Sequence, residues 1–108
     1  MKVYINRKKS GVKAVGEFDL STRNLTVLKG SVLSAEIAYT EKFRGAKSVE
    51  KSREGIVKDC VLQQDIIFKS ASTATNFVTG SSTHGLTAWK DEAGRTIKDI
   101  LLEVDKDE

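Results

Sequence analysis

The stretch FKSASTATNFVTGSSTHGLTAWKDEAG, residues 68–94, places two runs of small residues on either side of Phe77 and includes the only tryptophan of the chain, Trp89. A serine of Ser70-Ala71-Ser72 can cap a helix, because its hydroxyl accepts a hydrogen bond from a free amide of the first turn. We expect a short helix there that ends at Gly80 and carries its apolar side chains on one face. The small residues allow this helix to lie close to a sheet, and Phe77 is the expected anchor.

The sequence before this helix predicts strands. Apolar residues alternate through residues 12–19, which is the pattern of a half-buried strand. Turn residues at 20–24 separate this segment from the apolar run 25–33, so the two predict a β-hairpin. Further strands are expected at residues 3–5, 60–68 and 86–90.

Two more helices and several loops complete the expected organisation. A helix over residues 49–54 is expected to stop at Gly55, because helices often end on a left-handed glycine. The C-terminal helix follows a cap at Thr96, repeats apolar residues at helical spacing and has Asp99 near its positive end. Residues 34–45 fit either a loop or an edge strand, and tight turns are expected at 84–85 and 91–94. These elements predict a small α+β domain, with a twisted antiparallel sheet and about three short helices on one face.

Length and composition limit the class of protein. A chain of 108 residues can bury one core, so we expect a single domain over residues 1–108, with 105–108 as a frayed tail. No apolar run approaches the ~20 residues of a membrane span and no secretory signal is visible, so we expect a cytoplasmic protein without a membrane partner. With one cysteine, Cys60, and one histidine, His84, no zinc site can be assembled, and no metal or cofactor is expected. Cys60 fits a small buried hydrophobe.

Charge is distributed unevenly along the chain. Residues 1–53 carry a net charge of +7 and residues 54–108 carry −4, giving +3 for the whole. Such polarity attracts phosphate backbones or an acidic partner, although folding can also mix the two halves into an ordinary solvated surface.

Several short motifs occur in a fixed order. They are TVLKGS at 26–31, REG at 53–55, D-x-x-F-x-S-x-S at 65–72, A-x-x-F-V-x-G-x-S-x-x-G at 74–85, W-K at 89–90 and G-x-T-I at 94–97. Over about residues 12–104 the chain resembles domain-of-unknown-function family 4357, which is similar to the RAMA domain, the restriction enzyme and adenine methylation associated module. Two departures are Ser70-Ala71-Ser72 where the family favours Ser-Pro-Ser, and His84-Gly85 where it favours Asn-Gly.

The resemblance implies a non-catalytic bacterial module linked to restriction-modification or nuclease systems. Its expected partner is DNA, including adenine-methylated DNA, and a nuclease or methyltransferase is a further candidate partner. We expect the chain to act alone, as a homodimer or beside such a partner. The alternative is a protein-interaction or oligomerisation domain that serves as an accessory subunit.

The candidate DNA-binding residues combine cations with hydrogen-bonding groups. They are Lys47, Lys51, Arg53, Lys69, Ser70, Ser72, Asn76, Ser81, Thr83, His84, Trp89 and Lys90. A helix start at the two serines can bind a phosphate or can simply be capped. Trp89 can stack on a base or fill the core, and His84 can contact a partner or be a surface turn residue.

No catalytic residues are expected. The neighbouring carboxylates at 91–92 and 105–108 fall in a turn and at a chain end, where no enclosed cleft would raise a pKa for acid–base catalysis. The single histidine lacks a paired nucleophile. The glycines form no phosphate-binding loop, so nucleotide hydrolysis has no motif to support it.

Overall fold

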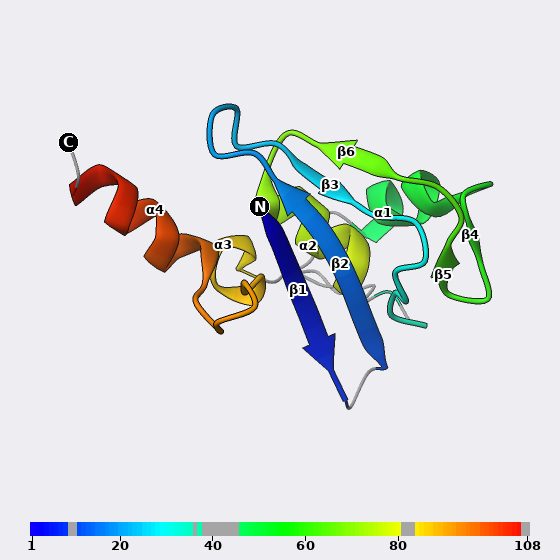
Figure 1. Cartoon of the computed structure of the whole chain (residues 1–108). Coiled ribbons are helices and arrows are strands. Elements are labelled where there is room, and N and C mark those ends of the chain that lie inside the picture. Colours follow the sequence, from blue (N-terminus) through cyan, green and yellow to red (C-terminus); the bar gives the residue numbers. More distant parts are fainter. Residues whose placement is uncertain (9–10, 36, 38–45, 81–83, 107–108) are drawn as a thin grey trace.

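A four-stranded antiparallel sheet forms the centre of the molecule in the computed structural model, which describes residues 1–8, 11–35, 37, 46–80 and 84–106 (Figure 1). The sheet contains β1 (Lys2–Arg7), β2 (Val12–Phe18), β3 (Leu25–Val27) and β6 (Ile66–Phe68), in the order β1-β2-β3-β6. A small second sheet pairs β4 (Val57–Lys58) with β5 (Val61–Leu62). The helices are α1 (Ala46–Arg53), α2 (Ala71–Thr79), α3 (Gly85–Ala88) and α4 (Ile97–Lys106). The predicted α+β class is confirmed, with four helices in place of three among the described residues.

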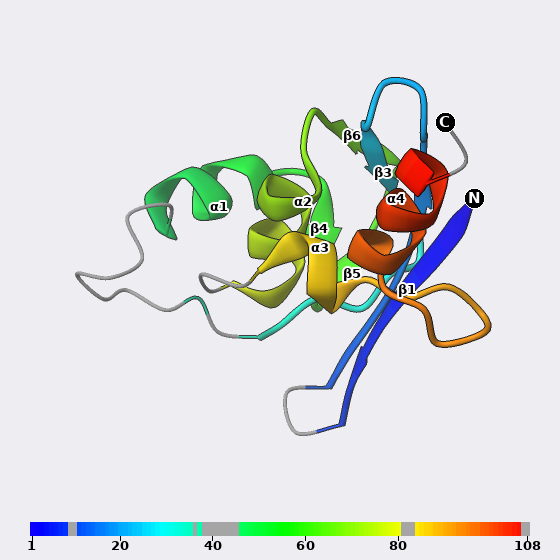
Figure 2. The same ribbon diagram turned by 90° about the vertical axis from the view of Figure 1, so that its left-hand side faces the viewer.

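The two faces of the sheet differ in burial. Alternate residues of β2, from Val12 to Phe18, are buried, as the period-2 pattern predicts. They join β3 and helix α2 in one hydrophobic core. Figure 2 shows α1, α2 and α3 together on one side of the strands.

Helix α2 forms as predicted and lies in the core. Ser70 is its N-cap, and its Oγ accepts a hydrogen bond from the Thr73 amide at 3.2 Å. The helix ends at Gly80, whose φ of 67° is the left-handed conformation expected of a C-terminal glycine. Phe77 of this helix and Trp89 next to it are both fully buried. Trp89 Nε1 donates to Thr75 Oγ1 at 2.7 Å. The tryptophan at the end of the stretch therefore fastens the segment after α2 onto the helix.

The predicted strand over residues 86–90 is wrong, because a helical turn, α3, occupies most of it. The amides of Thr87 and Ala88 both donate to the His84 carbonyl, which closes the turn. Gly85 does not adopt a left-handed conformation. A glycine fits here for a steric reason, because a Cβ at this position would lie 2.4 Å from the amide nitrogen of Ser72. Trp89 and Lys90 are extended after this turn, and Lys90 forms a bridge with Tyr4 of β1.

Two long predicted strands are shorter in the structure. In the run 25–33, strand β3 ends at Val27, Gly30 turns the chain with a φ of 91°, and Val32 then forms isolated bridges with Lys13 and Val61. The run 60–68 splits into β5 and β6, because the polar residues between them leave the ladder and Asp65 Oδ1 accepts a hydrogen bond from the Lys29 amide at 2.7 Å. Cys60 is half-buried in the β4–β5 turn with a φ of 66°, so it is not the buried strand residue that was predicted.

The first and last helices agree with the sequence pattern. Helix α1 begins three residues earlier than predicted and ends before Gly55, which has a φ of 78°. Thr96 Oγ1 accepts a hydrogen bond from the Asp99 amide at 3.2 Å at the start of α4. Most of residues 34–45 lie outside the described residues, as do 107–108. Within the described part of the chain, every helix is too short or too polar to cross a membrane.

Candidate anion-binding site at the start of helix α2

A pocket of about 290 Å³ opens at the start of helix α2. Three of the predicted site residues, Lys69, Ser70 and Ser72, line it together. Arg23 reaches the same pocket from the turn between β2 and β3. The remaining lining is apolar and comes from four elements or their ends: Phe18, Ala71, Leu86 and Leu101.

The charged side chains that line this pocket are all positive. Lys69 and Arg23 are exposed, and neither forms an ion pair within the described residues. No acidic side chain lines the pocket, and none lies in the first turn of α2. The N-terminal end of a helix carries a partial positive charge, so cations placed there repel it. An anion in the pocket would remove this repulsion.

The two serines have different roles. Ser70 is engaged as a cap, since its Oγ also lies 2.9 Å from Thr73 Oγ1. Ser72 is exposed, and among the described residues no group accepts a hydrogen bond from its amide or from that of Ala71. First-turn amides are the donors that bind anions at helix starts, but here Ala71 is buried and Gly85 packs against the Ser72 amide. For Ser70 the capping alternative holds, whereas Ser72 keeps its hydroxyl available to a ligand.

Arg23 is held at the pocket by a constrained turn. Its amide donates to the Asp19 carbonyl at 2.7 Å, and its φ of 63° is left-handed, which costs a non-glycine residue about 1–2 kcal/mol. The Asp19 carboxylate accepts from the amides of Ser21 and Thr22, and these hydrogen bonds lower the pKa of Asp19. Sequence reasoning missed Arg23, because only the pairing of β3 with β6 brings this turn next to α2.

Two predicted residues have structural roles instead. Trp89 has 0% of its surface exposed and donates to Thr75, so its ring offers no face to a base. The Arg53 guanidinium donates to the carbonyls of Phe77 and Ser34, at 2.6 to 3.0 Å, and lies over the Phe77 ring. Arg53 thus satisfies carbonyls at the C-terminal end of α2 and has its donors occupied. Neither residue fits the predicted role of a DNA contact.

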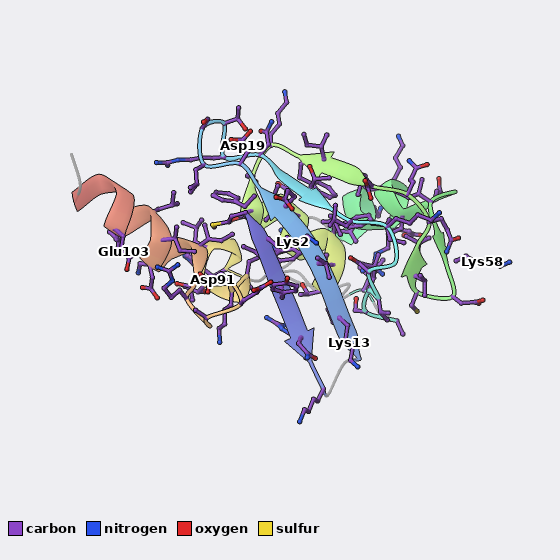
Figure 3. All side chains as sticks on the ribbon, viewed as in Figure 1. Lys2, Lys13, Asp19, Lys58, Asp91 and Glu103 are labelled. Carbon is purple, nitrogen blue, oxygen red and sulfur yellow. The ribbon has the colours of Figure 1, made fainter. Side chains whose placement is uncertain are left out.

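The other predicted cations do not join the pocket. Lys47 and Lys51 are exposed on α1. Lys90 lines a separate hollow with Asp91 and Glu92, where the Tyr4 hydroxyl donates to Glu92 at 3.1 Å. Figure 3 shows that other charged residues are also spread over the molecule, with Lys58 on the opposite side from Glu103 and Lys13 at the lower end of β2.

Of the remaining predicted residues, the structure describes His84 and Asn76. His84 is exposed just before Gly85, whose backbone lies on the first turn of α2. Asn76 is half-buried within the helix, and its carbonyl accepts from the Gly80 amide. Ser81 and Thr83 lie outside the described residues.

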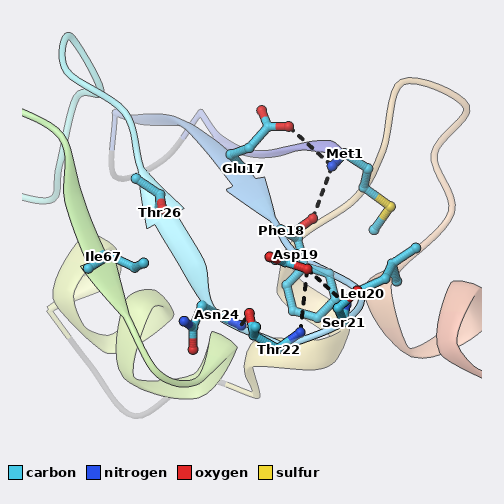
Figure 4. Close-up of a pocket in the computed structure, with 10 residues that line it drawn as sticks. All are labelled: Met1, Glu17, Phe18, Asp19, Leu20, Ser21, Thr22, Asn24, Thr26 and Ile67. Atoms are coloured by element: carbon cyan, nitrogen blue, oxygen red, sulfur yellow. Dashed lines mark hydrogen bonds and ion pairs between the residues drawn. The ribbon is translucent and has the colours of Figure 1, made fainter.

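A larger hollow, of about 470 Å³, lies beside the turn between β2 and β3 (Figure 4). Its carboxylates are already engaged, because Asp19 accepts from turn amides and Glu17 lies 3.1 Å from the Met1 amino group. Two carboxylates make this hollow a poor place for a phosphate. In the described part of the chain, no group of three or more His, Cys, Asp or Glu side chains could hold a metal ion.

Comparison with known proteins places the chain in a family. The family model described as a domain of unknown function (DUF4357) matches residues 3–101. This match begins earlier than the resemblance at 12–104 and therefore includes β1. No curated protein and no solved structure matches the chain significantly. Because the match spans nearly the whole chain, this protein belongs to the DUF4357 family of domains of unknown function.

Proposed function

We propose that this protein is a non-catalytic DNA-associated binding module, which holds a backbone phosphate in the pocket at the start of α2. The observation that carries the proposal is the presence of two cations, Lys69 and Arg23, at the positive end of a helix, with no acidic residue in the pocket lining or in the first turn of the helix. Folding alone favours carboxylates at that position. A phosphate gives the cations a partner and interacts favourably with the helix end.

The chemistry of the pocket suits a sugar–phosphate strand. Arg23 presents a planar fork of donors, Lys69 presents a compact charge, and the Ser72 hydroxyl adds a neutral donor. The apolar floor formed by Phe18, Leu86 and Leu101 suits the face of a sugar or a base next to the phosphate. Phosphate contacts fix position and do not read sequence, so recognition of adenine methylation needs further contacts.

Fluorescence anisotropy with short labelled DNA tests this function. The set should contain a duplex, the same duplex with methylated adenine, and a single strand, each at low and moderate salt. Loss of the two charge-assisted contacts in the variant Arg23→Gly, Lys69→Glu should weaken binding at least tenfold, since each contact contributes about 1.5–3 kcal/mol. The slope of affinity against salt should fall by about two counterions.

A matched control keeps the charge change and moves it away from the pocket. Lys47→Glu, Lys51→Gln changes the charge of two exposed cations on α1 by the same total of three units, and we expect a much smaller loss of affinity than in the pocket variant. Equal losses in the two variants would show that net charge alone drives binding. Absence of binding to every DNA at low salt would refute the proposal.

A second candidate function, an accessory subunit that associates with another protein chain, is supported by a different observation. Strand β6 forms one edge of the main sheet, and Ile67 at its centre is exposed. An apolar side chain on an unpaired edge is a common feature of surfaces that add a strand from another chain.

A further inference from the structure

The two edges of the main sheet are not equivalent. At the β1 edge, the Tyr4 amide donates to the Lys90 carbonyl at 2.7 Å and the Lys90 amide donates back to Tyr4 at 3.0 Å. Strand β6, at the opposite edge, pairs only with β3 among the described residues. Its central residue, Ile67, has 64% of its surface exposed, more than Leu20 at 42% or Leu102 at 51%. Figure 1 shows β6 at the upper margin of the sheet, with no other labelled strand beyond it.

The hydrogen-bonding pattern shows which backbone groups of β6 face outward. Hydrogen-bonded and non-hydrogen-bonded pairs alternate along two antiparallel strands. The Leu28 amide donates to the Val15 carbonyl and the Asp19 amide donates to the Asn24 carbonyl, so the Glu17–Thr26 pair, midway between them, is also a hydrogen-bonded pair. The backbone groups of Thr26 therefore point to β2, and those of its two neighbours point to β6. Ile67 is opposite Thr26, so its own amide and carbonyl point away from the sheet.

The sequence around Ile67 is complementary to itself. In an antiparallel pair centred on this residue, Ile67 meets Ile67 of the second copy, and Asp65 and Lys69, which flank β6 directly, come near Lys69 and Asp65 of that copy. Asp65 and Lys69 are both exposed, Asp65 Oδ1 accepts a hydrogen bond from the Lys29 amide, and no backbone–backbone hydrogen bond engages the amides or carbonyls of either residue in the described structure. Charges at a free edge ordinarily prevent self-pairing because like charges meet. Here opposite charges meet, which favours a cross-strand pair.

We propose that a second copy of this chain docks on the β6 edge, in an antiparallel arrangement with a two-fold axis at Ile67. The two sheets then join into one, and the outward amide and carbonyl of Ile67 bond to those of its counterpart. Ile66 and Phe68, which are only half-buried on the core side of β6, gain cover from the same pairing. The edge is short, so the dimer is weak and dissociates on dilution.

Sedimentation equilibrium of the full chain over a concentration series up to ~1 mM tests the dimer, because a Kd as weak as ~1 mM is still detected there. The weight-average mass should rise from that of one chain, 11.9 kDa, toward twice that value. Ile67→Lys should keep the mass at one chain, because two like charges then face each other. Ile67→Glu should do the same.

Mixing these two variants provides the decisive arm. The ammonium group introduced in one variant would face the carboxylate introduced in the other, so the mixture should associate although each variant alone does not. Leu102→Lys is the matched control, since Leu102 is also an exposed apolar residue, 51% exposed on α4, and its substitution should leave association unchanged.

Three results would overturn the proposal: a constant mass of one chain, association by Ile67→Lys equal to the unmodified chain, or loss of association only in Leu102→Lys. Because Lys69 also lines the pocket at the start of α2, none of the variants in this test changes Lys69. Failure of DNA binding would therefore not affect the outcome of this test.

Discussion

Cationic side chains from outside the helix lie at both ends of helix α2, but their interactions with the helix differ. At the C-terminal end, Arg53 donates to carbonyls at the negative end of the helix and lies over Phe77. At the N-terminal end, Arg23 and Lys69 lie near the positive end and have no ion-pair partner in the described structure. The first arrangement stabilises the fold, whereas the second opposes the helix dipole.

This difference separates structure from function within one nine-residue helix. A cation that satisfies buried carbonyls is explained by folding alone. Cations near the positive end of the helix, one of them on a left-handed residue, oppose the folding of the free protein, and the proposed function gives them a ligand. The comparison predicts that substitutions at the C-terminal end destabilise the protein, and that substitutions at the N-terminal end stabilise it and weaken binding.

The largest effect is expected from Phe77→Ala. Phe77 is fully buried, contacts Phe68 with ring centroids 5.1 Å apart, and lies under Arg53. Its truncation should lower the free energy of unfolding by about 3–5 kcal/mol in urea titrations, because a cavity forms in the core. An unchanged unfolding midpoint would contradict the placement of α2 in the core.

Arg53→Met should have the next largest effect. The carbonyls of Phe77 and Ser34 lose their charged donor, and an unsatisfied carbonyl in a buried position costs about 1–3 kcal/mol. Lys51→Met on the same helix is the control, since an exposed substitution changes stability by about 0.5 kcal/mol or less. If the two variants melted alike, Arg53 would not hold the end of α2.

Arg23→Gly should change stability in the opposite direction. Glycine adopts the φ of 63° without the penalty of about 1–2 kcal/mol, although part of the gain is lost to the flexibility of the unfolded chain. The melting temperature should therefore rise slightly while affinity for DNA falls. A lower melting temperature would mean that the Arg23 side chain contributes to folding.

Acidification tests the turn that positions Arg23, with the smallest effect. Amides donate to the carboxylates of Asp19 and Asp91 and lower the pKa of both. Their contribution to stability is complete above the ordinary aspartate pKa of 3.8 and is lost as the pH falls through the lowered values. Asp19→Asn should therefore reduce the fall in melting temperature that acid causes. The fall that remains is the one caused by protonation of Asp91. A loss identical to that of the unmodified chain would refute the role of Asp19.

The stretch at 68–94 was predictable where local chemistry decides the structure. Ser70 as cap, Gly80 as terminator and Phe77 as anchor follow from capping rules and helical spacing. The helical turn α3 was not predictable in this way, because Leu86 and Ala88 also fit a strand and the turn depends on Gly85 lying against α2.

The candidate site was predictable only in part. Lys69, Ser70 and Ser72 are adjacent in sequence and stay together in the pocket. Arg23 is distant in the chain and reaches them through sheet pairing, which no local pattern encodes. Arg53 and Trp89 resemble DNA contacts by residue type, but their roles depend on tertiary hydrogen bonds.

The most direct test of the account is to melt and titrate one protein, the variant Arg23→Gly, Lys69→Glu, beside the unmodified chain. Removing cations and adding a carboxylate at the start of α2 should raise stability by roughly 0.3–1 kcal/mol from the dipole alone. We predict a higher melting temperature together with at least tenfold weaker binding to a short DNA duplex. Unchanged DNA affinity in a folded variant would contradict the claim that this end of the helix binds phosphate.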